Sequence, residues 1–255
     1  MVDASEKGPI LVFLGPTLRL SEAEPVLDAV YLQPAAQGDI LLAAHAFRPR
    51  AMVLIDGQFE DRPAVRHKEI LWAMAQGIVV IGAASMGALR AAELSEFGMI
   101  GVGLIYRWYR RWRLAPDDAV AVLSGPPELG FLPLTDALVD LQRTFANLTR
   151  RGFITAADRD LLTTTARNMN FRERRFDAIL RDAGWQEERF KELRKEMVGQ
   201  KRLDALLALR SARALVMQEN ARPVSCAWVA TNTFVRDLEA GGIDSKLANT
   251  YKLNP

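Results

Sequence analysis

Apolar runs of strand length alternate with helical segments over the first 105 residues, and this alternation most constrains the fold. Each run is apolar throughout, which is typical of strands buried on both faces. Strands that alternate with helices favour a parallel sheet covered by helices on both faces. The expected strands are PILVFLG (9–15), AVYLQP (29–34), AMVLIDG (51–57), IVVIGAA (78–84) and MIGVGLIY (99–106). The expected helices are SEAEPVLDA (21–29), QGDILLAAHAF (37–47), PAVRHKEILWAMAQG (63–77) and MGALRAAELSEFG (86–98).

After about Pro116 the segments all have helical spacing, carry mixed charges and are separated by short Gly, Pro or Thr breaks. The expected helical segments are 117–123, 133–152, 155–168, 170–184 and 186–217. The sequence therefore predicts an α/β region over 1–115 with a mostly parallel, doubly wound (Rossmann-like) sheet and the functional site. An all-helical C-terminal region over 116–255 follows it. We expect the charges of residues 172–203 to lie on a solvated helical face.

Composition excludes several classes of protein. With 255 residues, 49% of them hydrophobic and 25% charged, the chain resembles ordinary globular proteins. A single cysteine, Cys226, rules out a disulfide framework within the chain, and one Cys with two His argues against a zinc site. No glycine-rich nucleotide motif is present, so we expect neither a cofactor nor a metal. Residues 1–8 lack a signal-peptide pattern and no apolar run approaches membrane-spanning length, so we expect a cytoplasmic protein.

Polar and small residues follow three of the expected strands. They are Gly15, Pro16 and Thr17 after the first strand, Asp56 and Gly57 after the third, and Ser85 after the fourth. The carboxyl ends of parallel strands lie at one edge of the sheet, where such sheets bind their ligands. His67 and Lys68 begin a helix and belong at that same edge. His45 ends a helix and belongs at the opposite edge.

The segment VVIGAASMGALRAAEL (79–94) places Ser85 between a buried strand and a helix. The arrangement A-x-S-x-G resembles a nucleophile elbow, in which a tight turn exposes a hydroxyl above the sheet, with Ala83 where glycine is usual. The backbone N–H groups of Met86 and Gly87 would then form an oxyanion site at the helix start. The alternative is that Ser85 only caps the helix.

A nucleophilic serine needs a base nearby, and His67, Lys68 and Glu69 are candidates on the same edge. Lys68 stands in the first turn of a helix, where the helix dipole disfavours a cation, and burial would lower its pKa further. His67 with Asp56 would give a Ser-His-Asp arrangement. His67 and Lys68 point about 100° apart on the helix, so they are not expected to face Ser85 together. The residues alone do not choose between them.

The segment YRWYRRWR (106–113) interleaves arginines with aromatic residues. It favours an aromatic face on the core with arginines outside, or a surface that docks a protein partner. Binding of nucleic acid through Arg110 and Arg111 is a third alternative. A net charge of +2 gives no overall field that would favour it, so we expect no nucleic-acid partner.

Several phrases together resemble the TfuA family. They are VFLGPTL (12–18), LQPAAQGDIL (32–41), VLIDGQF (53–59), VRHKEIL (65–71) and VIGAASMGALRAAELSEFGMIGVG (80–103). The resemblance covers roughly residues 10 to 120, and the stretch from Gly82 to Glu93 is its most specific part. YRWYRRWR departs from the family pattern, where a polar, often glycine-containing stretch is expected.

The resemblance implies a role beside YcaO enzymes, which use ATP to activate peptide backbone amides for thioamidation. It implies hydrolysis of a thiocarboxylated ubiquitin-fold sulfur carrier of the ThiS type, with release of sulfide for YcaO. It also implies a Ser-Lys pair, which by motif is Ser85 and Lys68, and so favours Lys68 over His67 as the base. Gly15, Pro16, Thr17, Asp56 and His67 would line the pocket. The alternative function is a non-catalytic adaptor that activates YcaO, and a homo-oligomer is also compatible with the sequence.

Overall fold

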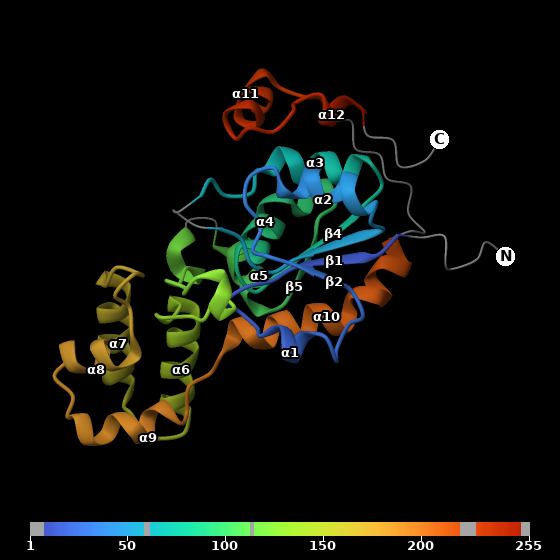
Figure 1. Cartoon of the computed structure of the whole chain (residues 1–255). Coiled ribbons are helices and arrows are strands. Elements are labelled where there is room, and N and C mark those ends of the chain that lie inside the picture. Colours follow the sequence, from blue (N-terminus) through green and yellow to red (C-terminus); the bar gives the residue numbers. More distant parts are fainter. Residues whose placement is uncertain (1–7, 59–61, 113–114, 220–227, 251–255) are drawn as a thin grey trace.

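The computed structural model contains a five-stranded sheet in which all neighbouring strands are parallel, in the order β2-β1-β3-β4-β5 (Figure 1). The structure describes residues 8–58, 62–112, 115–219 and 228–250. Cys226, Arg113 and residues 1–7, which entered the sequence predictions, lie outside this part. The strands are β1 Ile10–Phe13, β2 Val30–Leu32, β3 Ala51–Leu54, β4 Val79–Ala83 and β5 Ile100–Val102. The predicted α/β class with a parallel sheet and a helical C-terminal part is confirmed.

Helices cover both faces of the sheet, and alternate strand residues supply the two cores. Leu11, Met52 and Val80 face one core, which contains α2 (Asp39–Phe47), α3 (His67–Ala75) and α4 (Met86–Leu94). Val12, Val53 and Ile81 face the other, which contains α1 (Leu20–Ala23) and α10 (Gln200–Glu219). The central strands are buried throughout because both of their faces are covered.

The expected last strand is shorter than predicted, because residues 104–106 belong to helix α5 (Leu104–Arg111). Gly103 breaks the strand with a φ of 99°, a conformation that favours glycine. A Cβ atom on Gly103 would lie 2.3 Å from the side chain of Asp204 on α10. That carboxylate accepts a hydrogen bond from the N–H of Ile105 at 2.8 Å. A contact from distant α10 therefore fixes the start of α5.

The helices that follow form two further groups (Figure 1). One group stands beside the sheet and consists of α6 (Leu138–Arg150), α7 (Ala156–Asn168), α8 (Phe176–Asp182) and α9 (Phe190–Arg194). The other consists of α11 (Asn232–Ala240) and α12 (Leu247–Thr250), which lie outside α2 and α3. The segment 117–123, predicted as helix, has only a 3-10 turn over Asp117–Val120. Among the described helices, none is long and apolar enough to cross a membrane.

The prediction that residues 172–203 form a solvated charged face is wrong for two cations. Arg174 is only 1% exposed, and its guanidinium pairs with Asp118 at 2.8 Å and donates to the carbonyls of Ala166 and Met169. Lys201 is 4% exposed at the start of α10. Periodicity did not reveal these contacts because Asp118, which pairs with Arg174, and Val120, which accepts from Lys201, lie 56 and 81 residues away in the sequence. The boundary at residue 115 between an α/β region and a helical region stays a prediction. Helix α10 lies after this boundary in the sequence but packs in one of the two cores of the sheet.

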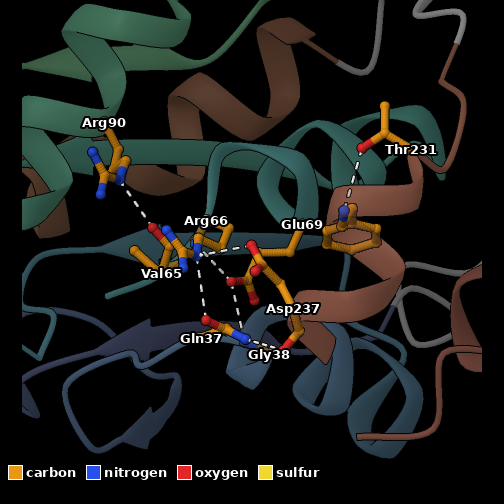
Figure 2. Close-up of polar contacts among 9 residues, drawn as sticks. Gln37, Gly38, Val65, Arg66, Glu69, Arg90, Thr231 and Asp237 are labelled. Carbon is orange, nitrogen blue, oxygen red and sulfur yellow. Dashed lines mark hydrogen bonds and ion pairs between the residues drawn. The ribbon is translucent and has the colours of Figure 1, made fainter. Parts of the chain in front are cut away.

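The start of α3 is held by a fully buried carboxylate, that of Glu69 (Figure 2). It accepts hydrogen bonds from the backbone N–H groups of Arg66 at 2.7 Å, Gly38 at 3.1 Å and Ile40 at 3.2 Å. Burial raises the pKa of Glu69 to about 7, and these three hydrogen bonds oppose the rise. Asp237 of α11 also belongs to this cluster. Its carboxylate forms an ion pair with Arg66, and its backbone carbonyl accepts a hydrogen bond from the side-chain amide of Gln37. One carboxylate thus joins α2 to α3, next to the point where α11 docks.

We predict that Glu69 makes the protein less stable as the pH rises from 4.5 to 7. The folded pKa of about 7 lies above the ordinary value of 4.5, so the folded state binds the proton more tightly and loses that advantage across this window. Relative to Glu69→Gln, the wild-type free energy of unfolding should fall by about 3 kcal/mol over the window. Urea unfolding at several pH values measures this. Glu128→Gln, a substitution at an exposed residue, is the control. A stability difference between wild type and Glu69→Gln that does not change with pH would contradict the prediction.

Candidate functional site

A strained turn places Ser85 between β4 and α4. The N–H of Ser85 donates to the carbonyl of Ala83 at 2.7 Å, closing a three-residue turn around Ala84. Ala84 has a φ of 66° and is fully buried. Three-residue turns with a positive φ at the centre are rare and strained, and such strain gathers at functional sites. The strand-to-helix elbow predicted for this segment is therefore present, with its strain at the residue before the serine.

Ser85 occupies the N-cap position of α4, but its side chain makes no capping hydrogen bond. The backbone at Ser85 has φ −123° and ψ −126°, away from the extended geometry typical of an N-cap. The side chain is not sealed from the surroundings, because Ser85 is 8% exposed and lines a pocket. Neither the hydrogen bonding nor the backbone conformation of Ser85 therefore supports the hypothesis that Ser85 only caps the helix.

Glycine residues allow α4 to approach the sheet closely beneath this turn. A Cβ atom on Gly87 would lie 1.7 Å from the carbonyl oxygen of Leu54. The N–H of Gly87 donates to the carbonyl of Ile55 at 3.2 Å. It is therefore engaged with the end of β3 and is not available to an oxyanion. Of the two N–H groups predicted to bind an oxyanion, those of Met86 and Gly87, only that of Met86 is left as a candidate. Met86 lines the pocket.

The carboxylate of Asp56 joins the ends of β1 and β3. It accepts from the N–H of Gly15 at 2.9 Å, from the N–H of Thr17 at 3.1 Å and from the Thr17 hydroxyl at 2.6 Å. Asp56 is only 1% exposed. The chain passes from β1 outward to β2 and then back across to β3, so this is the switch point of the sheet, where such folds form their crevice. Gly15 and Thr17 therefore do not line the pocket themselves but hold the carboxylate of Asp56, which does.

A pocket of about 70 Å³ lies at this edge of the sheet, room for about two water molecules. Pro16, Asp56, Ser85 and Met86 of the predicted site line it. Residues from more distant parts of the chain also line it, among them Leu89, Asp117, Val120, Ser124, Arg172 and Lys201. The prediction that the residues following β1, β3 and β4 meet at one edge is thus confirmed.

The three candidate bases from the sequence are not among the residues that line the pocket, and Glu69 is bonded at the junction of α2 and α3. The amine of Lys68 donates to the carbonyl of Val229 at 3.3 Å, and Lys68 is not among the residues that line the pocket. His67 is 45% exposed at its side chain and pairs with Glu93 on α4 at 2.7 Å. Glu93 also pairs with Arg90 at 2.8 Å. A Lys68–Ser85 dyad stays a prediction, without a contact in this structure to support it.

The lysine that does line the pocket is Lys201, which sequence reasoning missed. It is the second residue of α10, and its N–H donates to Asp140 of α6 at 2.9 Å. The signal used for Lys68, a lysine in the first turn of a helix, applies equally to Lys201. It was hidden because residues 186–217 look like one long helix, whereas α10 begins only after Gly199.

Residues 56–175 match the family model described as TfuA-like protein. The chain carries a TfuA-like domain. This match confirms the family assignment that the sequence motifs predicted. The matched stretch includes Lys68 and Ser85 and ends before Lys201. No curated protein matches the chain.

We predict that Ser85→Ala leaves the free energy of unfolding within about 0.5 kcal/mol of wild type, because the side chain makes no capping bond. Thr155→Ala is the matched control, since the Thr155 hydroxyl accepts from the N–H of Asp158 and caps α7. That variant should lose about 1 kcal/mol. Chemical denaturation of both variants measures the two effects. An equal or larger loss in Ser85→Ala would show that Ser85 has a structural role.

Proposed function

We propose that this TfuA-like protein hydrolyses a thiocarboxylated ubiquitin-fold sulfur carrier of the ThiS type and supplies sulfide to a YcaO enzyme for backbone thioamidation of a peptide. The observation that carries the proposal is the uncapped hydroxyl of Ser85, presented by a strained turn to a pocket. A helix cap needs neither the strain nor the pocket. A nucleophile needs a pocket, because a free oxygen must reach its substrate, and a strained strand-to-helix turn is how a nucleophile elbow exposes such an oxygen.

The proposed reaction has two steps that balance in atoms and charge. In the first, the oxygen of Ser85 bonds to the carrier's terminal carbonyl carbon, the C–S bond breaks, and the serine proton leaves with sulfur as HS⁻. Met86 lines the pocket at the start of α4, and we propose that its N–H stabilises the developing oxyanion. In the second, water attacks the serine ester and releases the carrier as a carboxylate with one proton.

The shape of the site suits a narrow, flexible chain end. A second pocket of about 390 Å³ shares Leu89 and Asp117 with the pocket of Ser85. We propose that the two pockets form one path, called here the tail groove, which passes between α4 and α5 beside Tyr109 and Trp112. An extended peptide tail would pass along this groove, and its thiocarboxylate would reach Ser85. Arg172, which also lines the inner pocket, supplies a positive charge for that anion.

We predict that Ser85→Ala abolishes release of sulfide from thiocarboxylated carrier. The nucleophile would be lost, and losses of at least 1,000-fold are typical of such sites. Ser124→Ala is the matched control, because Ser124 lines the same pocket, and it should keep the wild-type rate. Sulfide release by the purified protein is the measurement. If Ser85→Ala releases sulfide as wild type does, or wild type releases none while still activating YcaO, the protein is an adaptor.

We predict that Asp117→Trp raises KM for the carrier about tenfold, with little change in kcat for a small thioester. Asp117 is exposed at the junction of the two pockets, so an indole there narrows the groove without touching Ser85. The same substitution at Asp182, an exposed acid at the end of α8, is the control. Equal effects of both substitutions on the carrier would argue against the tail groove.

A further inference from the structure

We propose that a groove between α5 and α6 binds an acidic segment of a partner protein, with one large apolar side chain of that segment seated beside Trp108. This surface, called here the α5–α6 groove, shares no lining residue with the pocket of Ser85. The proposal therefore does not depend on the role of Ser85. It gives a function to the segment YRWYRRWR (106–113), whose arginines take no part in the proposed reaction.

Helix α5 turns its aromatic residues to two different sides. Tyr109 is 4% exposed, and its hydroxyl donates to the carbonyl of Pro116 at 3.2 Å, so this residue belongs to the core. Trp112, just after the end of the helix, is 57% exposed, and Leu104, at its start, is 37% exposed. Tryptophan exposed beside arginine is typical of a surface that binds a protein.

Two pockets border α5 and α6, and both are lined by Trp108 and Gln142. One has a volume of about 280 Å³ and the other a volume of about 820 Å³. The aliphatic residues that line the smaller pocket are Leu104, Ile105, Val139 and Ala146. This lining suits a large apolar side chain. The shared residues place the larger pocket next to the smaller one, so a segment seated in one would reach the other.

The lining of the groove carries three arginines without a carboxylate partner. Arg143 of α6 lines the smaller pocket, and Arg111 of α5 and Arg167 of α7 line the larger one. Within the described part of the chain, none of the three forms an ion pair. Asp118, which also lines the larger pocket, is bound to Arg174 at 2.8 Å. The groove therefore presents uncompensated positive charge, which favours an anionic partner.

The two helices that form the groove add no negative charge that would repel such a partner. Helix α5 contains no Asp or Glu. Asp140, the acid of α6, accepts the backbone N–H of Lys201 at 2.9 Å and lines neither pocket. An acidic segment would therefore meet arginines along the groove and no carboxylate from α5 or α6.

A protein segment suits the groove better than a nucleic acid. The guanidinium of Arg111 lies over the ring of Trp112, 5.6 Å from its centroid, and so covers one face of that ring. Trp108 packs edge-on against Tyr109, with ring centroids 4.9 Å apart. The two tryptophan rings are thus not arranged as a platform on which successive bases stack. The aliphatic lining of the smaller pocket favours an apolar amino-acid side chain.

The test is the binding of a short fluorescein-labelled peptide in which Asp and Glu residues flank one Leu-Phe pair, measured by fluorescence anisotropy. The peptide should bind with micromolar affinity, and the affinity should fall as salt is added. The same peptide with Lys in place of the acids should bind at least 10-fold more weakly. An acidic peptide with Ser in place of the Leu-Phe pair should also lose at least 10-fold.

Charge reversal at two positions tests the groove itself. The double variant Arg143→Glu with Arg167→Glu changes two exposed side chains of the lining and should lower the affinity at least 10-fold. The matched control is Arg150→Glu with Arg159→Glu. It makes the same change in net charge on the same two helices, at residues that line neither pocket, and should keep the affinity within about twofold.

Crosslinking separates this groove from a general attraction to basic surfaces. With a photoreactive analogue in place of its Phe, the acidic peptide should crosslink within residues 104–112 or 139–146. Crosslinks confined to other parts of the chain would overturn the proposal. The absence of binding by the acidic peptide would do the same, as would equal weakening in the two double variants at unchanged folded content. Tighter binding of a single-stranded oligonucleotide, lost in the Arg143 and Arg167 variant, would reject a protein segment in favour of a nucleic acid.

Discussion

The hydrogen bonds of the Asp56 carboxylate are the interaction on which the site depends. Asp56 binds two backbone N–H groups and one hydroxyl of the loop after β1, so the ends of β1 and β3 are held together at the switch point. A buried carboxylate whose donors were removed would be strongly unfavourable, and this makes the arrangement well defined. The pocket forms beyond this junction, with Ser85 on the next strand of the sheet.

The elbow at Ser85 depends on close packing of α4 against β3 and β4. Gly82 and Gly87 leave no room for a side chain, because a Cβ atom on Gly82 would lie 2.1 Å from the carbonyl of Gly87. This packing allows a turn of three residues with the strained conformation at Ala84. Strain of this kind persists only where the surrounding structure holds it in place. The same packing engages the N–H of Gly87, and so limits the predicted oxyanion donors to Met86.

Helix α10 joins the sheet and the helices α6 to α9 beside it at one site. Its apolar side packs on the sheet, and its first five residues bring Lys201 and Asp204 to the carboxyl edge. Asp140 of α6 accepts the N–H of Lys201, so the group of helices beside the sheet is tied to the same turn. The predicted helical region is thus part of the site, and the α/β region alone would lack the wall of the pocket that Lys201 and Val120 form.

The sequence by itself determined the parallel sheet, the elbow at Ser85 and the gathering of Asp56 and Ser85 at one edge. These follow from local periodicity, small residues at a turn and the common direction of parallel strands. It also predicted a lysine in the first turn of a helix as base, and named Lys68 from the motif. Only the tertiary structure decided that Lys68 bonds to Val229 and that Lys201 lines the pocket. The reason is physical: Lys201 is 116 residues away from Ser85 in the sequence, and only the packing of α10 across the sheet brings its amine there.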